Sequence, residues 1–347
     1  MPRRVGTLKT CSTVTAGIDA ANRDHVAAEC DGSIRYSSST DGRSWSTTVF
    51  AHPAHREDLD PQIAFQGNLV YVAFTRIVPD GGCGGGRGEA IGVFVRTRSL
   101  PDGAWSTARR IGRPGDTLEV FRVEGATIHA TVWNNRDERD YGGPDQVDYE
   151  MLAGSVTHRY RIPGAVGRTA MRIGSDGRAR IAYETGTGIR FATFTGAGFA
   201  TTRIARSNSG EDVRPALVLD SNDDAHILWT RKPGEGGCVT RDTNPDDGTY
   251  YSTNAGGAWT SKRITKSVGE TSLQIDPASG RIHALVSGRV GIWYFTNASE
   301  GPWTARRILA KGWVNSPLIR RDPATGRLLV VYLGGLDGTK PYAMTGT

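Results

Sequence analysis

The sequence predicts an all-β fold, namely a seven-bladed β-propeller of four-stranded antiparallel blades. Three observations lead to this prediction. The 347 residues hold no convincing run with apolar residues at helical spacing, whereas short runs rich in Val, Ile, Tyr and Phe recur between Gly, Asp, Asn and Pro. A basic stretch followed by a branched apolar residue returns at regular intervals along the chain. Finally, the last repeat lacks one strand, and the N-terminus carries one strand too many.

The repeat is measured from the branched apolar residue that ends each basic stretch. These residues are Val5, Val49, Ile111, Ile162, Ile204, Ile264 and Ile308. They are separated by 44, 62, 51, 42, 60 and 44 residues, and the step from the last one through the C-terminus to Val5 is 44 again. A period of about 40 to 50 residues that holds four short strands is typical of a propeller blade.

Each period divides into four strands, as the second one illustrates with expected strands at 60–66, 69–76, 91–98 and 105–112. The last period has only three strands. We expect residues 1–9 to supply its outer strand, because such a closure removes an open sheet edge. The chain is thus one domain, with blades expected at 10–51, 52–113, 114–165, 166–207, 208–267, 268–311 and 312–347.

The charge of the chain argues against nucleic acid as a partner. The formal net charge is +6, and only six of the 42 basic residues are lysine. The positive charge is spread along the chain, whereas nucleic-acid binding needs it clustered on one surface. On an outer strand, basic pairs such as Arg109 and Arg110 would discourage pairing with another chain. No apolar run reaches the roughly 18 residues of a membrane helix, so no membrane partner is expected.

The turn between the third and fourth strands carries a recognisable pattern. Residues 251–259 read YSTNAGGAW, in which Ser252, Asn254, Gly256 and Trp259 match Ser-x-Asp/Asn-x-Gly-x-x-Trp. This pattern resembles the Asp-box, or BNR repeat, of sialidase-like β-propellers. Variants of it end at Trp45, Trp105 and Trp303. The resemblance implies that the box folds the turn, buries its aromatic ring and lies on the face opposite the ligand site.

Two shorter matches to sialidases carry less information. Residues 160–163, YRIP, mimic a motif whose arginine holds a sialic-acid carboxylate, but here they occupy the outer-strand position shared by the other repeats. Residues 183–185, YET, resemble the Tyr and Glu that sialidases use as nucleophile and base, although in those enzymes the two come from separate strands. Sialidases also have six blades, whereas this sequence counts seven.

Long loops indicate where a ligand would bind. The connections between the second and third strands at 77–90, 134–146 and 232–247 are much longer than a tight turn requires. These connections share one face of a propeller with the starts of the first strands. We therefore expect one ligand site at the channel mouth on this face.

Arginines gather at the same strand ends. Arg76 and Arg231 both close a Thr-Arg strand end, and Arg56, Arg168 and Arg214 lie at the starts of first strands. Guanidinium groups suit carboxylates and sugar hydroxyls. The alternative is that these arginines only pair with neighbouring acids, namely Asp58, Asp60, Glu211 and Asp212.

Aromatic rings are the second group of candidate ligand-binding residues. Trp133, Tyr183, Trp229 and Trp313 lie near the same strand ends. A ring face can stack on a sugar. The alternative is packing between blades.

Glycoside hydrolysis needs two carboxylates at a set separation. The candidates at the expected mouth are Asp58, Asp60, Glu184, Glu211, Asp212 and Glu270. We expect no cofactor and no zinc, since the histidines are scattered and no Cys-x-x-Cys occurs; the acidic segments 220–224 and 243–249 are candidate calcium ligands.

The four cysteines form two candidate disulfides. Cys11 begins the first strand of an expected hairpin and Cys30 ends its second strand, so antiparallel pairing brings them together. Cys83 and Cys238 fall in two matched long loops. Paired cysteines favour an oxidising compartment. No apolar core follows Met1, so we expect any leader to have been removed before residue 1.

Together these features predict a secreted, monomeric propeller that binds carbohydrate, with hydrolase or lyase activity on an acidic glycan. Two alternatives stay open. A non-catalytic lectin would show repeated shallow pockets, and a protein-binding scaffold would show a broad apolar loop surface.

A thiol assay tests the cysteine prediction. Unreduced, unfolded protein should react with essentially no thiol reagent because all four cysteines are paired. Four titratable thiols would contradict both pairings.

Overall fold

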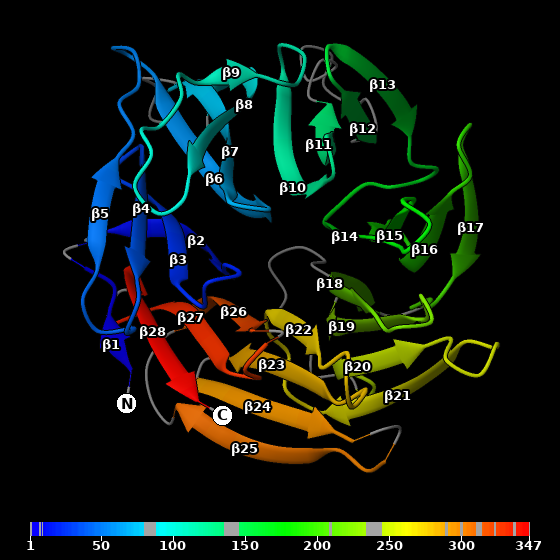
Figure 1. The fold of residues 1–347 in the computed structure, drawn as a ribbon. Helices are drawn as coiled ribbons and strands as arrows, with labels where there is room; N and C mark the ends of the chain where they lie inside the picture. The colour runs from blue at the N-terminus through cyan, green and yellow to red at the C-terminus, as the bar shows by residue number, and fades with distance from the viewer. Residues whose placement is uncertain are drawn as a thin grey trace. The chain divides into compact units, whose positions relative to one another are not determined.

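The structure is a computed structural model that describes residues 2–6, 8, 10–79, 88–134, 146–207, 210–233, 245–288, 291–298, 301–309, 314–322, 324–335 and 338–346. These residues form seven four-stranded antiparallel sheets, as expected of a seven-bladed β-propeller (Figure 1). The described ranges contain no helix that could cross a membrane.

The first three sheets follow the chain, each with its four strands side by side in sequence order. Sheet one contains β2 (Cys11–Ile18), β3 (Asp24–Cys30), β4 (Ser33–Ser39) and β5 (Ser46–Val49). Sheet two contains β6 (Glu57–Gln66), β7 (Leu69–Val78), β8 (Glu89–Ser99) and β9 (Arg109–Arg110). Sheet three contains β10 (Asp116–Glu124), β11 (Thr127–Asn134), β12 (Val147–Ala153) and β13 (Val156–Arg161).

The next three sheets repeat this order. Sheet four contains β14 (Thr169–Ile173), β15 (Ala179–Thr185), β16 (Gly188–Phe194) and β17 (Phe199–Arg203). Sheet five contains β18 (Gly210–Leu219), β19 (Ala225–Pro233), β20 (Gly248–Thr253) and β21 (Thr260–Thr265). Sheet six contains β22 (Thr271–Ile275), β23 (Ile282–Gly288), β24 (Gly291–Asn297) and β25 (Thr304–Leu309).

The seventh sheet joins the two ends of the chain in the order β1-β28-β27-β26. Its strands are β26 (Asn315–Arg321), β27 (Leu328–Gly334), β28 (Lys340–Gly346) and β1 (Arg3–Arg4). Strand β1 pairs with β28, where Arg3 lies opposite Ala343 (Figure 1). Val5 and Leu8 then enter a core with Leu329 and Val331. The predicted outer strand from the N-terminus is confirmed.

The chain divides into two compact units. Unit 1 comprises Met1–Arg161, Arg327–Leu333 and Thr339–Thr347. Unit 2 comprises Ile162–Gly326 and Gly334–Gly338.

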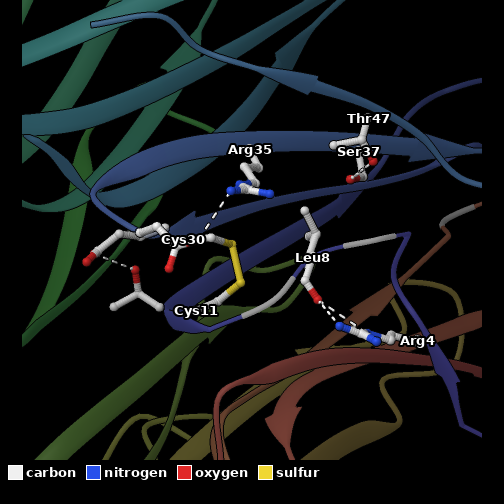
Figure 2. The surroundings of a disulfide bond; sticks show 10 residues. Arg4, Leu8, Cys11, Cys30, Arg35, Ser37 and Thr47 are labelled. Atoms are coloured by element: carbon white, nitrogen blue, oxygen red, sulfur yellow. Dashed lines mark hydrogen bonds and ion pairs between the residues drawn. A yellow bond between two sulfur atoms is a disulfide. The ribbon is translucent and has the colours of Figure 1, made fainter.

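A disulfide between Cys11 and Cys30 closes the first hairpin of unit 1 (Figure 2). The two residues are direct cross-strand partners on β2 and β3, as the sequence predicts. Close by, the Arg4 guanidinium donates to the Leu8 carbonyl over 2.6 Å and fixes the entering N-terminal segment (Figure 2). The second predicted pair, Cys83 with Cys238, lies outside the described residues.

Tryptophans at the turns between third and fourth strands pack against the preceding sheet. Trp105 meets Tyr36 edge-on at a centroid distance of 4.8 Å. The other contacts of this kind are Trp259 with Phe191 at 5.2 Å and Trp303 with Tyr251 at 5.1 Å. These three tryptophans thus fill the space between neighbouring sheets, which is the structural role expected for them.

Histidine and tyrosine bridge the second and third strands in four sheets. In each case His Nδ1 and the tyrosine hydroxyl share a hydrogen bond. The pairs are His25–Tyr36, His129–Tyr149 (2.7 Å), His226–Tyr251 (2.5 Å) and His283–Tyr294 (2.6 Å). Burial lowers the pKa of His25, His129 and His283 to about 4 each. These imidazoles are therefore neutral in the folded protein at neutral pH.

Acid should destabilise the protein through these buried histidines. An unfolded histidine takes up a proton near pH 6.5, whereas the folded ones do so near pH 4. Stability is therefore fully present above pH 6.5 and falls as the pH drops towards 4, because only the unfolded chain binds the protons. The melting temperature measured across this range should show the decline.

Two variants isolate the effect. The melting temperature of His129→Gln should decline less steeply with falling pH than that of the wild type. Glutamine does not titrate but can still accept the hydrogen bond from the Tyr149 hydroxyl. His158→Gln alters an exposed histidine of the same sheet and should follow the wild-type curve. Identical curves for wild type and His129→Gln would contradict the assignment.

Candidate functional site

Three first strands contain a strained residue within their first five positions. Asp60, Arg214 and Ser316 have φ angles of 50°, 59° and 49°, in the left-handed region, and each directly precedes a proline. In β6 and β18 the register shifts at this point, which marks a bulge. Non-glycine residues adopt this conformation only where their surroundings enforce it, and such residues concentrate at functional sites.

A glutamate accepts a hydrogen bond from the backbone N–H at each of these three positions. The Arg214 N–H donates to Glu184 Oε1 over 2.6 Å, and the Ser316 N–H donates to Glu270 Oε2. In unit 1, the Asp60 N–H donates to Glu29 Oε2 over 3.2 Å. Each glutamate is thereby held through one of its oxygens.

In unit 2 these residues form one group at the starts of neighbouring first strands. Strands β14, β18, β22 and β26 contact one another in that order. The Glu184 N–H donates to the Arg168 carbonyl over 3.0 Å, and Thr271 Oγ1 donates to the Arg214 carbonyl over 2.7 Å. We call Arg168, Glu184, Arg214 and Glu270 the edge cluster.

Glycine allows Glu184 to take its place in the edge cluster. A Cβ atom on Gly167 would lie 2.1 Å from Glu184 Oε2. Any larger residue at 167 would therefore displace the carboxylate. The close approach leaves Glu184 part-exposed and oriented by the backbone.

The two arginines of the edge cluster keep their guanidinium groups available. Arg214 makes no side-chain hydrogen bond or ion pair within the described residues. The Arg168 side chain is 58% exposed, and its Nη1 lies 3.8 Å from Glu270 Oε1. The cluster thus brings two arginines and two backbone-oriented glutamates to one strand edge, and side chains of these types can bind an anionic group and transfer protons beside it.

The two arginines at the ends of second strands, in contrast, form ion pairs with aspartates. Arg76 forms a two-point ion pair with buried Asp58, at 2.6 and 2.9 Å. Arg231 repeats the arrangement with Asp212, at 2.6 and 3.0 Å. The structure thus shows the pairing with neighbouring acids that was the alternative to ligand binding.

Burial affects the second of these ion pairs. It raises the pKa of the Asp212 carboxyl, although the hydrogen bond from Arg231 lowers it. The same hydrogen bond raises the pKa of Arg231. Arg231 also lies over the rings of Trp229 and Tyr250, at 5.3 Å from each. Its guanidinium therefore serves chiefly to fix the end of β19.

The predicted aromatic residues lie mostly in the core. Tyr183 is fully buried and donates to the Pro163 carbonyl over 3.0 Å. Trp229 is 2% exposed and stacks on Tyr250 at 4.5 Å. Protein atoms therefore cover these ring faces, as the packing alternative requires. Trp133 is part-exposed, whereas Trp313 lies outside the described residues.

The remaining acidic candidates serve local roles. Glu211 lies 3.1 Å from Lys232 Nζ across the strand pair. Asp220, in the candidate calcium segment 220–224, accepts the N–H groups of Asn222 and Asp224. Within the described ranges, no group of three or more His, Cys, Asp or Glu side chains could hold a metal ion.

Sequence reasoning missed Ser316 and Glu29 as parts of this strand-edge arrangement. The available signal is the X-Pro dipeptide near the start of the first strand, which recurs at Asp60, Arg214 and Ser316. A residue before proline is restricted in conformation, so three such dipeptides at equivalent positions mark a shared backbone feature.

Solved structures place this architecture among known propellers, although no family model and no curated protein matches the chain. An ulvan lyase bound to a repeat of glucuronic acid and 3-sulfated rhamnose is 12% identical, with a TM-score of 0.62 over 99% of this chain and 98% of its own. The chain shares its fold with carbohydrate-active β-propellers.

Two further structures agree. An α-L-arabinanase of Penicillium chrysogenum complexed with arabinobiose is 11% identical, with a TM-score of 0.58 over 100% of this chain and 98% of its own. A sialidase of Streptococcus pneumoniae is 10% identical, with a TM-score of 0.51 over 99% of this chain and 70% of its own. At such identities the similarity establishes the fold alone.

Substitution of Glu184 should reveal its hold on the neighbouring strand. Glu184→Ala leaves the Arg214 N–H without its acceptor and should lower the free energy of unfolding by about 1 to 3 kcal/mol. Glu184→Gln retains an acceptor oxygen and should lower the free energy of unfolding by less. Urea unfolding measures both.

Glu211→Ala is the control for this comparison, because its ion pair with Lys232 lies at the surface and should contribute little. If Glu184→Ala is no less stable than Glu211→Ala, the glutamate does not hold the bulge.

Proposed function

We propose that the protein recognises an acidic glycan at the edge cluster of unit 2 and cleaves it as a hydrolase or a lyase. The observation that carries this proposal is the presence of two available arginines beside two oriented glutamates. Arg76 and Arg231, by contrast, are each matched with a buried aspartate.

The arginines suit the acidic group of such a substrate. A guanidinium donates two parallel hydrogen bonds to a carboxylate or sulfate, which fixes the orientation of the sugar as well as its charge. Arg214 is anchored through its backbone on both sides, by Glu184 and Thr271. Its side chain therefore extends from a fixed base.

The glutamates suit the cleavage step. In a hydrolase, one carboxyl protonates the leaving oxygen while the other acts as base or nucleophile. In a lyase, one carboxylate removes the proton next to a uronate carboxylate, whose charge an arginine neutralises as negative charge develops. The bonds from Arg214 and Ser316 to Glu184 and Glu270 keep both groups oriented for either reaction.

The solved structures support the same substrate class. The ulvan lyase is bound to a chain containing glucuronic acid and sulfated rhamnose, and the arabinanase to arabinobiose. We further propose membership of the Asp-box propellers, since the turns ending at Trp105, Trp259 and Trp303 pack as that repeat would. The Cys11–Cys30 disulfide is in keeping with a secreted protein, and we propose that it acts as a monomer.

A panel of polysaccharides tests this function. Uronate-containing, sulfated and neutral polysaccharides are incubated with the protein, and both reducing ends and unsaturated sugar products are measured. A hydrolase should release reducing ends alone, whereas a lyase acting on uronates should also produce ultraviolet absorbance. We expect activity on an acidic polymer and none on a neutral one.

Variants assign the roles. Arg168→Gln and Arg214→Gln should weaken binding about 10-fold or more, since each loses a charge-assisted hydrogen bond worth about 1.5 to 3 kcal/mol. Glu184→Gln and Glu270→Gln should lower kcat about 100-fold or more. Arg178→Gln, which changes an exposed arginine of the same unit, should behave like the wild type.

The outcomes separate the alternatives. Binding without product would make the protein a lectin. Absence of binding to every acidic polymer, or wild-type binding by Arg214→Gln, would contradict the proposed site.

A further inference from the structure

The segment that carries Glu270 is bonded to three strands of unit 2. Gly269 and Glu270 directly precede β22, and Thr271 begins it. Thr230 Oγ1 on β19 donates to the Gly269 carbonyl over 2.9 Å, and the Ser287 N–H on β23 donates to the Glu270 carbonyl over 3.0 Å. Thr271 in turn donates to a carbonyl of β18. Three consecutive residues are thus fixed by contacts with β18, β19 and β23.

The close packing of Gly269 leaves its peptide little freedom. A Cβ atom at this position would lie 1.5 Å from the Ser287 carbonyl oxygen, so only glycine fits. The peptide that joins Gly269 to Glu270 is therefore packed against β23 while Thr230 holds its carbonyl. Because the peptide is planar, its orientation sets the direction in which the Glu270 side chain leaves the backbone.

Thr230 is the buried donor in this arrangement. It is fully buried, so water does not compete for its hydroxyl. Its β-branched side chain is stiff about χ1, which fixes the direction of the donated hydrogen bond. Thr230 directly precedes Arg231, whose ion pair with Asp212 fixes the end of β19. The hydroxyl is therefore presented from a fixed strand.

The Glu270 carboxylate makes two contacts beyond its own sheet. One oxygen accepts the Ser316 N–H of β26, and the other lies 3.8 Å from Arg168 Nη1. A rotation of the peptide between residues 269 and 270 would move the carboxylate away from both partners. The two contacts thus depend on the orientation that Thr230 maintains.

We propose that Thr230 is a positioning residue for Glu270 and acts through the Gly269 carbonyl. Loss of the hydroxyl would leave this carbonyl without its donor and free the peptide to rotate. The positioning follows from the contacts above, whereas its effect on catalysis rests on the proposed function. The two are therefore measured separately.

Thr75 in unit 1 offers a matched control. It is 1% exposed and occupies the same place at a Thr-Arg strand end. Its hydroxyl accepts a hydrogen bond from the Leu118 N–H over 2.8 Å, in a different sheet from Glu270. Thr75→Val therefore removes a buried hydroxyl at the equivalent strand position without touching the Glu270 segment.

The amide signal of Ser316 tests the positioning. Because this N–H donates to Glu270, its proton shift should change as that carboxyl takes up a proton, in an NMR titration of the full-length protein with pH. Glu270→Gln should abolish the change. Thr230→Val should lose at least half of it, whereas Thr230→Ser, which keeps the hydroxyl, and Thr75→Val should retain it. Thr230→Ala, which places no methyl group against the Gly269 carbonyl, should show the same loss as Thr230→Val.

Melting temperatures of the same proteins separate positioning from stability. Thr230→Val and Thr75→Val should both melt lower than the wild type, since each leaves a buried backbone group without its partner. A common loss of stability then cannot explain a change at Ser316 that is confined to the Thr230 variants. A wild-type Ser316 titration in Thr230→Val, an equal loss in Thr75→Val, or a titration that survives in Glu270→Gln would overturn the proposal.

A polysaccharide that the protein cleaves adds the catalytic readout. Thr230→Val should lower kcat about 10-fold with little change in KM, because a misplaced carboxylate still lets the substrate bind, and Thr230→Ser should restore most of the rate. Wild-type kcat together with a lost Ser316 titration would support the positioning and contradict the catalytic role of Glu270. If no polymer is cleaved, the proposed function fails, and the Ser316 titration alone decides the positioning.

Discussion

The pairing of β1 with β28 is the interaction on which the other sheets depend. A series of sheets that pack face to face needs each sheet complete, because an incomplete one exposes both an edge and an apolar face. Strand β1 completes the seventh sheet from the opposite end of the chain, and Val5 and Leu8 join the adjoining core. The Cys11–Cys30 disulfide then fixes the hairpin that follows directly.

Neighbouring sheets are linked by polar contacts as well as apolar ones. The Leu118 N–H donates to Thr75, and the Ile319 N–H donates to Ser272, each across one sheet boundary. The glutamates of the edge cluster belong to the same class of contact. Their carboxylates hold a strained backbone, and Glu270 also lies 3.8 Å from the Arg168 guanidinium, so the same atoms serve the fold and the proposed chemistry.

Much of the fold could be predicted because its signals are local. Strand alternation, turn residues and the repeat of the basic stretches are all read within one blade, and Cys11 and Cys30 fall at the ends of one hairpin. The candidate site was harder. Whether Tyr183 meets a ligand or a neighbouring strand depends on which face of β15 is covered. The left-handed backbone at Ser316 is bound by Glu270, 46 residues away.

The pairing of β1 with β28 also constrains when the protein can complete its fold during synthesis. Strand β1 precedes the other 27 strands in the sequence and its partner β28 is the last of them, so the seventh sheet cannot be complete until β28 has been synthesised. Closing so long a loop is slow compared with forming a hairpin. After β28 has been made and before β1 pairs with it, β28 has an unpaired edge. Strand β1 of the nascent chain therefore stays unpaired until β28 has been made. A chain truncated before β28 would leave β1 without its partner strand.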